Sequence, residues 1–411
     1  MNSPTSFGRR GAAPPLARPT ARAPALAVDS PAPAAPDWVI ASDPDRLPRL
    51  PLVTLGLIGL LALIFLGQQH WGFEPGELQS YRSLVAMGAD RADLVLAQGQ
   101  WWRVMTAMLL HGGVEHLVGN CVALLIAGLM LERRLGGAWF AAIFVLGGVA
   151  GSLASLVYNP EGTLSVGASG AIMALLVPCL IEAFGNETVY TPKRARLYVL
   201  MMVASALIPT DSHIDYRDHL GGAMVGGMFG YVLLIAVPEL HDAPAGRRIA
   251  SGVAVLGALA AAIGFGFAAA AYPALAARDA ALIPDERLKA VMAGQAAAAP
   301  EARESQALGL IARYPHDPRS HMALAVALLQ DRKIDEAEDE IRGALTQEDV
   351  LARDLPPDTG RYLHGLLGAI VFAEGRQDEG RAEARTVCAG HSTAPNLVKL
   401  KAALQKEGVC G

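Results

Sequence analysis

Long uncharged apolar runs dominate the middle of this chain, and they restrict its fold more than any other feature. Residues 51–277 carry 25 charged side chains among 227, whereas residues 278–411 carry 38 among 134. Seven runs approach the length at which an apolar helix crosses a bilayer. They cover residues 51–67, 114–131, 135–160, 162–181, 197–209, 219–237 and 249–277. Buried helices of a large soluble protein do not require so many uncharged runs, so the sequence predicts an all-α polytopic membrane bundle.

The chain divides into a leader, a membrane body and a polar tail. Residues 1–50 hold ten of the 26 prolines and show no periodicity, which predicts a disordered cytoplasmic leader. A mitochondrial presequence is the alternative for this segment. Short loops on one side of the predicted bundle carry seven Lys and Arg residues, and those on the other side carry one. This bias places the N-terminus inside, and with seven helices the tail, residues 278–411, lies outside.

The tail resembles tetratricopeptide repeats. Small or apolar residues recur at the positions that such helical pairs bury, and about three stacked units are needed for stability. In the first unit these residues are Leu324, Ala325, Leu328, Ala337, Ile341 and Ala344, and in the second they are Leu367, Gly368, Gly375 and Gly380. We therefore expect a soluble helical domain that binds a protein partner. Cys388 and Cys410 are either disulfide-bonded or two free thiols.

A serine between two glycines begins one of the apolar runs. Gly167, Ser169 and Gly170 follow a predicted outer loop, so the unpaired N–H groups of a helix N-terminus would lie beside the hydroxyl. A serine that merely caps a glycine-packed helix is the alternative. By itself this motif indicates a nucleophile beside an oxyanion site only weakly.

A histidine on a second small-residue helix strengthens the interpretation. His219, Gly222 and Gly226 share one helix face, and the two glycines allow close helix contact in a membrane. A general base can thereby meet Ser169, although a histidine bonded to a backbone carbonyl is the alternative. Asp218 points about 100° away from His219, so we interpret it as a helix-start residue and expect a catalytic dyad.

His116 and Asn120 lie four residues apart on one helix face, and both can donate a hydrogen bond to an oxyanion. Two polar residues that bridge helices are the alternative. His111, Glu115 and His116 do not fit the H-x-x-E-H zinc spacing, and neither HExxH nor an aspartyl-protease GxGD motif occurs. We expect no metal and no cofactor. The net charge of −5 argues against a nucleic-acid partner.

Five short motifs in one order make residues 52–238 resemble the rhomboid family of intramembrane serine proteases. The motifs are W-R, H-x4-H-x3-N, E-x3-G, G-x-S-G and H-x2-G-x3-G. The matching residues are Trp102, Arg103, His111, His116, Asn120, Glu132, Gly136, Gly167, Ser169, Gly170, His219, Gly222 and Gly226. One departure is Met173, which stands where an aromatic ring often stacks on the histidine.

The resemblance implies a six-helix core over residues 51–238, with Ser169 as nucleophile and His219 as base. It also implies an oxyanion hole formed by His116, Asn120 and the Ser169 backbone N–H, with Gly167 nearby. The expected substrates are transmembrane segments of other membrane proteins in the lipid bilayer, with the enzyme in a bacterial inner membrane. A seventh helix at residues 249–277 lies outside this core. A non-catalytic relative that binds membrane proteins is the alternative function, and a transporter is a third.

Overall fold

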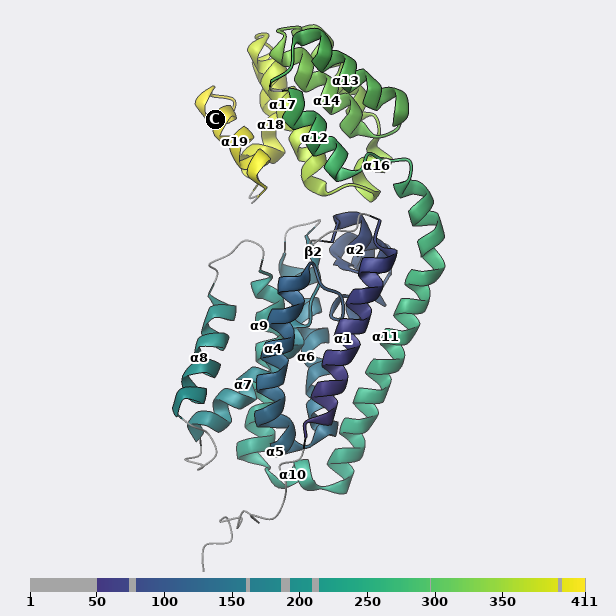
Figure 1. Cartoon of the computed structure of the whole chain (residues 1–411). Coiled ribbons are helices and arrows are strands. Elements are labelled where there is room, and N and C mark those ends of the chain that lie inside the picture. The colour runs from purple at the N-terminus through teal and green to yellow at the C-terminus, as the bar shows by residue number, and fades with distance from the viewer. Residues whose placement is uncertain are drawn as a thin grey trace, which may run out of the picture. The chain divides into compact units, whose positions relative to one another are not determined.

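The structure is a computed structural model that describes residues 50–73, 79–159, 163–185, 193–208, 214–295, 297–390 and 394–410. Residues 1–49 of the predicted leader, which covers residues 1–50, lie outside the described residues. The described chain is helical apart from one two-stranded antiparallel sheet (Figure 1). This confirms the predicted all-α class.

The membrane body contains long apolar helices joined by short ones. Its α-helices are α1 (Leu52–Trp71), α2 (Tyr81–Met87), α3 (Arg103–Ala107), α4 (Val114–Ala127), α5 (Arg133–Leu135), α6 (Gly137–Tyr158), α7 (Ser169–Gly185), α8 (Lys193–Leu207), α9 (Tyr216–Tyr231), α10 (Glu239–Asp242) and α11 (Pro244–Asp279). Its π-helical turns are η1 (Asp93–Ala97), η2 (Gly128–Glu132) and η3 (Val232–Ala236). Strands β1 (Asp90–Arg91) and β2 (Leu164–Ser165) pair Asp90 with Ser165.

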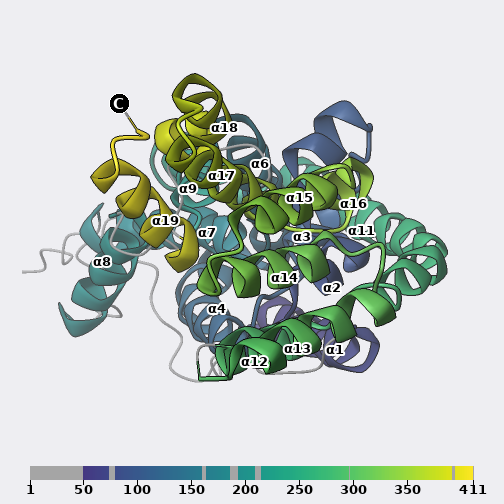
Figure 2. The same ribbon diagram turned by 90° about the horizontal axis from the view of Figure 1, so that it is seen from above.

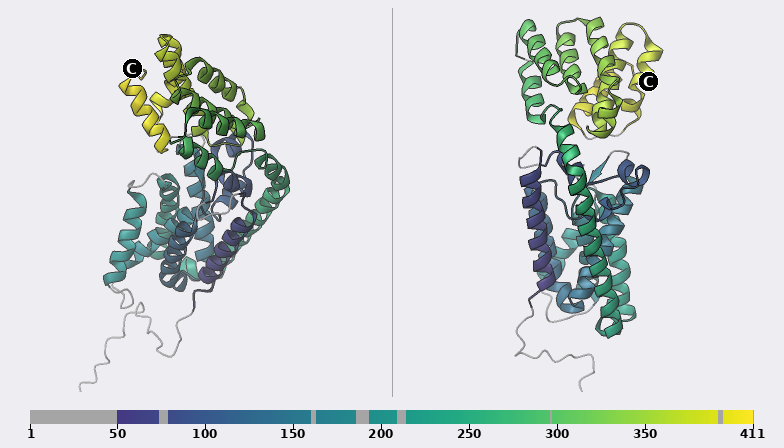
Figure 3. Two further views of the ribbon diagram at one scale, coloured as in Figure 1. Left: turned by 45° about the horizontal axis from the view of Figure 1, so that its top comes forward. Right: turned by 90° about the vertical axis from the view of Figure 1, so that its right-hand side faces the viewer.

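Five helical stretches of the described residues are long and apolar enough to cross a membrane. They are Leu52–Trp71, Val114–Leu135, Gly137–Tyr158, Tyr216–Ala236 and Pro244–Asp279, and α7 is a shorter apolar helix. The predicted run at 197–209 overlaps α8 from residue 197 to the end of the helix at Leu207. The chain is therefore a multi-pass membrane protein, while a total of seven spans stays a prediction. The predicted seventh helix lies within α11, which runs beside the bundle (Figure 3).

Glycines allow α6, α7 and α9 to pack in close contact, and the view from above shows these three helices as neighbours (Figure 2). A Cβ atom added at Gly222 would lie 1.9 Å from the Gly170 carbonyl oxygen. One added at Gly226 would lie 2.6 Å from the carbonyl oxygen of Ala174. No side chain fits at either position, because real Cβ atoms do not approach other atoms so closely. Backbone contact between α7 and α9 therefore depends on these glycines.

Glu132 binds the start of the first membrane helix. Its carboxylate accepts hydrogen bonds from the backbone N–H groups of Val53, at 3.0 Å, and Thr54, at 2.8 Å. The Thr54 hydroxyl donates a third bond at 2.6 Å. A helix N-terminus has unpaired N–H groups and a partial positive charge, and a buried carboxylate satisfies both. Gly136, four residues on, ends this turn with a φ of 81°, which favours glycine.

Arg103 and Trp102 organise the loop between α1 and α4. The buried Arg103 guanidinium donates to the carbonyl oxygens of Val85, at 2.7 Å, and Ala89, at 2.9 Å, and lies over the Trp102 ring. The Trp102 ring stacks on Phe267 of α11 at 6.3 Å between centroids. The helix beyond the predicted six-helix core thus packs against this loop.

The tail is a series of packed helices: α12 (Asp285–Gln295), α13 (Pro300–Arg313), α14 (Pro318–Gln330), α15 (Ile334–Leu345), α16 (Glu348–Arg353), α17 (Pro357–Ala373), α18 (Gln377–Ala389) and α19 (Pro395–Lys406). Core residues of α14–α15 recur 43 positions later in α17–α18. The pairs are Leu324 with Leu367, Ala325 with Gly368, Leu328 with Val371, Ala337 with Gly380, Ile341 with Ala384 and Ala344 with Val387. Gly375 instead lies in the exposed turn between α17 and α18, with a φ of 89°. This recurrence agrees with tandem helical pairs.

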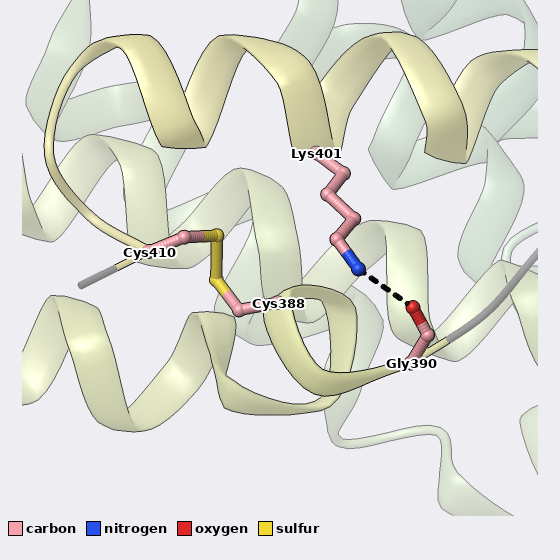
Figure 4. The surroundings of a disulfide bond; sticks show 4 residues. All are labelled: Cys388, Gly390, Lys401 and Cys410. Atoms are coloured by element: carbon pink, nitrogen blue, oxygen red, sulfur yellow. Dashed lines mark hydrogen bonds between the residues drawn. A yellow bond between two sulfur atoms is a disulfide. The ribbon is translucent and has the colours of Figure 1, made fainter.

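Cys388 and Cys410 form a disulfide with their Cα atoms 5.4 Å apart, which decides between the two alternatives left open by the sequence (Figure 4). The bond joins the end of α18 to the segment after α19. Nearby, the Lys401 ammonium donates to the Gly390 carbonyl oxygen at 2.9 Å (Figure 4). Two contacts therefore hold the last helix against the preceding pair.

Candidate active site

Ser169 is the first residue of α7 and follows a tight turn. Gly167 in this turn has a φ of 126°, and its N–H donates to the Ala107 carbonyl oxygen at 3.0 Å. Ala168 and Gly170 are buried, whereas Ser169 is partly exposed. The turn thus presents a hydroxyl at a helix N-terminus between neighbours too small to cover it.

The Ser169 hydroxyl donates its hydrogen bond to Asp218, with 3.3 Å between Oγ and Oδ2. The structure records no hydrogen bond between Ser169 and His219 among the described residues. The two residues of the predicted dyad therefore lie on adjoining helices, and the serine proton is directed to a different acceptor, Asp218.

His219 is buried on α9, and its ring is held by a backbone carbonyl. Nδ1 lies 2.6 Å from the Ala206 oxygen of α8. A carbonyl oxygen only accepts, so Nδ1 must carry a proton, and in the neutral ring Nε2 then keeps its lone pair. The alternative of a carbonyl-bonded histidine is thus realised, yet this bond selects the tautomer that a general base needs.

Glycine contacts place Ser169 and His219 at the same depth of the bundle. Gly170 directly follows Ser169, and it touches Gly222, which lies one turn after His219. Asp218, which directly precedes His219, reaches Ser169 itself. The N-terminal ends of α7 and α9 therefore meet at this point.

Three predicted oxyanion-site residues meet at the turn before Ser169. A Cβ atom at Gly167 would lie 2.7 Å from Cε1 and Nε2 of His116 and 3.6 Å from Nδ2 of Asn120. The donors of His116 and Asn120 therefore lie directly against the Gly167 backbone. This arrangement can surround an oxygen atom that develops negative charge beside Ser169.

His111 holds the Asn120 side chain in place by a hydrogen bond. The Asn120 amide donates to His111 Nε2 at 2.9 Å, because an amide nitrogen cannot accept. Burial, with the neighbouring His116 adding to it, lowers the pKa of His111 to about 3, so its ring stays neutral and accepts this bond. The Gln68 amide of α1 also bonds the His111 backbone N–H and carbonyl oxygen, at 3.0 and 2.9 Å.

Trp102, Arg103, Glu132 and Gly136 lie apart from this group. They hold the loop between α1 and α4 and the start of α1. Met173 is buried in α7 with 2% exposure.

Asp218 was not predicted to contact Ser169. Its interpretation as a helix-start residue was incomplete: it lies in the first turn of α9, but Asp215 is the N-cap, accepting from the N–H groups of Arg217 and Asp218. The angle of about 100° between neighbouring helical residues separates Asp218 from His219, but it does not specify which other helix Asp218 faces.

Comparison with known proteins gives consistent results. A family model described as "Rhomboid domain" matches residues 98–236. The chain is 36% identical over 158 residues to "RHOMBOID-like protein 1" of Arabidopsis thaliana, covering 37% of this chain and 40% of that protein. It is 35% identical over 184 residues to "Rhomboid protease GluP" of Bacillus subtilis, covering 44% of this chain and 34% of that protein.

A shorter relative is matched over most of its length. The chain is 32% identical over 141 residues to "Putative rhomboid protease YdcA" of Bacillus subtilis, which covers 34% of this chain and 71% of that protein. By contrast, the chain spans well under two thirds of the length of the two relatives above. The similarity is thus concentrated in the membrane body.

Proposed function

Since the chain belongs to the rhomboid family, we propose that it is an intramembrane serine endopeptidase that cleaves transmembrane segments of membrane proteins by a Ser169–His219 dyad. Relatives named as proteases support an intramembrane protease. The observation that carries the dyad is the Nδ1 bond of His219 to the Ala206 carbonyl, because it leaves Nε2 of the neutral ring as a proton acceptor.

The proposed reaction is an acyl transfer to Ser169 followed by hydrolysis. Ser169 Oγ forms a bond to the scissile carbonyl carbon while its proton passes to Nε2 of His219. His116, Asn120 and the Ser169 backbone N–H stabilise the oxyanion, with Gly167 leaving room for it. The carbon–nitrogen bond breaks as His219 returns the proton to the leaving nitrogen, and water, activated by the same base, releases the acyl group. No cofactor takes part in these steps.

Helical backbone in a membrane is fully hydrogen-bonded, so a substrate helix must unwind before its carbonyl can reach Ser169. We therefore expect cleavage where small or helix-weakening residues lie near the scissile bond. The substrates are membrane proteins within the same bilayer.

The proposed orientation puts the N-terminus in the cytoplasm and the tail, residues 278–411, outside a bacterial inner membrane. The Lys and Arg bias of the short loops supports it. The disulfide between Cys388 and Cys410 also supports it, since disulfides persist in oxidising compartments. The recurring core of α14–α15 and α17–α18 favours a tetratricopeptide-like domain that binds a protein partner.

The test is cleavage of a single-span reporter substrate in proteoliposomes by wild type and by Ser169→Ala. We expect the variant to lose cleavage and also labelling by a serine-directed fluorophosphonate. Ser152→Ala is the matched control, because its hydroxyl is buried in α6 and contacts the Val104 carbonyl oxygen at 3.4 Å. Cleavage by Ser169→Ala at the wild-type rate would remove Ser169 as nucleophile.

The second candidate is a non-catalytic rhomboid relative that binds and retains membrane proteins. This function predicts that wild type captures the substrate intact. It also predicts that fluorophosphonate labels neither wild type nor Ser169→Ala. Both assays therefore separate the two functions.

A further inference from the structure

A buried carboxyl touches the proposed nucleophile. Asp218 has 6% of its surface exposed, and its Oδ2 accepts the Ser169 hydroxyl at 3.3 Å. We propose that Asp218 is a positioning residue that holds the Ser169 hydroxyl away from His219 in the resting enzyme. This inference rests on the proposed function, because it concerns the same nucleophile.

The space around Asp218 is shaped for a carboxyl. A Cβ atom at Gly151 of α6 would lie 2.3 Å from Oδ1, and one at Gly170 of α7 would lie 2.6 Å from both oxygens. An alanine at either position would displace the carboxyl. Glycines on α6 and α7 thus leave the space that the Asp218 carboxyl of α9 occupies. The contact with Ser169 is therefore fixed by the packing of these three helices.

The neighbouring acid, Asp215, is bonded elsewhere. Its Oδ2 accepts from the side chains of Ser155, at 2.5 Å, Asn159, at 2.9 Å, and Ser165, at 2.8 Å. Among the described residues, Ser169 is the side chain that donates a hydrogen bond to Asp218. The side chains that bond the two carboxyls are therefore different, and the one that bonds Asp218 is Ser169.

A hydroxyl has one proton, so Ser169 can donate to Asp218 or to Nε2 of His219 but not to both. Only the second arrangement delivers the proton to the base as Oγ attacks. If most molecules rest in the first arrangement, the observed acylation rate is the intrinsic rate multiplied by the small fraction of molecules in the second arrangement. Rotation about the serine Cα–Cβ bond between staggered positions suffices to exchange the acceptors.

The prediction is a gain of reactivity on removal of the carboxyl. We expect Asp218→Asn, which keeps the shape but weakens the acceptor, to accelerate fluorophosphonate labelling of Ser169 about threefold. Asp218→Ala, which removes the acceptor, should accelerate it about tenfold. Reporter cleavage should rise in the same order. Loss of packing alone cannot produce this result, because a destabilised site reacts more slowly.

Asp215→Asn is the matched control, since it makes the same chemical change three residues away without contact to Ser169. Its labelling rate should not rise. All rates are taken per folded enzyme, measured by thermal unfolding of each variant in the same detergent.

An unchanged or reduced labelling rate in both Asp218 variants would overturn the inference. That result leaves the proposed function standing if Ser169→Ala is still unreactive. If Ser169→Ala itself reacts at the wild-type rate, the proposed function is wrong, whatever the Asp218 variants do.

Discussion

Replacing Asp90 with asparagine should stabilise the protein at pH 8 and leave its stability almost unchanged at pH 4. Asp90 lies in β1, in the loop between α1 and α4, with 1% exposure, and neither carboxyl oxygen has a hydrogen-bond partner among the described residues. Burial raises its pKa from an ordinary 3.8 to about 7, in spite of the nearby Arg103. Charging this side chain is therefore unfavourable in the folded state.

The sign of the pH dependence follows from proton binding. With a folded-state pKa above the unfolded one, the folded protein keeps its proton between pH 3.8 and about 7 while the unfolded chain loses it. Asp90 thus favours folding fully below pH 3.8, and this contribution disappears as the pH rises to about 7. A change of this size corresponds to about 4 kcal/mol, as an order of magnitude. Asparagine carries no charge at any pH and avoids that loss.

The assay is thermal unfolding in detergent at pH 4 and pH 8 for wild type and Asp90→Asn. We expect the variant to unfold several degrees higher at pH 8 and close to wild type at pH 4. Asp378→Asn, at an exposed position of the tail, is the matched control and should not change the pH dependence. If the difference in unfolding temperature between the variant and wild type were the same at pH 4 and pH 8, the reasoning would be refuted. Asp90 would then be charged in the folded protein at no cost.

Two further predictions concern the start of α1 and the tail. Glu132→Ala should lower the free energy of unfolding by about 2–4 kcal/mol, because it leaves the buried N–H groups of Val53 and Thr54 unpaired. Glu132→Gln should lower it by less, and equal unfolding temperatures for wild type and Glu132→Ala would contradict this prediction. In intact bacterial cells, Cys388 and Cys410 should not react with a membrane-impermeant maleimide until a reductant is added. In the Cys388→Ser variant, Cys410 should react without a reductant. If the wild-type cysteines react without a reductant, but only after cell lysis, the tail lies inside.

Small-residue patterns predicted much of the membrane body. Glycines four residues apart on a helix have few structural reasons to recur, so Gly222 and Gly226 indicated a helix contact that the structure places against Gly170 and Ala174. The start of α7 at Ser169 follows from the same logic, because Gly167 adopts a φ that other residues avoid. These features depend on local backbone properties, which the sequence records directly.

Contacts set by the relative rotation of helices were not predictable. The Ser169–Asp218 bond requires α7 and α9 to be rotated so that one first turn faces the other, and helix periodicity within either segment does not specify that angle. Likewise, Ala206 is one apolar residue among many in α8, and its backbone oxygen leaves no mark in the sequence. Periodicity shows which residues share a face, but not which helix that face meets.

The use of a carbonyl to orient His219 has an energetic reason in this setting. A carboxylate in that place would stabilise the imidazolium formed during catalysis, but it would also be a permanent charge in a low-dielectric interior, where desolvation costs several kcal/mol. The Ala206 carbonyl fixes the same tautomer without a net charge. The carboxyl that the site does contain, Asp218, lies instead on the serine side of the pair, between Gly151 and Gly170. While the Ser169 hydroxyl donates to Asp218, its proton is not directed toward Nε2 of His219. The same placement would therefore keep the proposed nucleophile protonated until a substrate carbonyl is in reach.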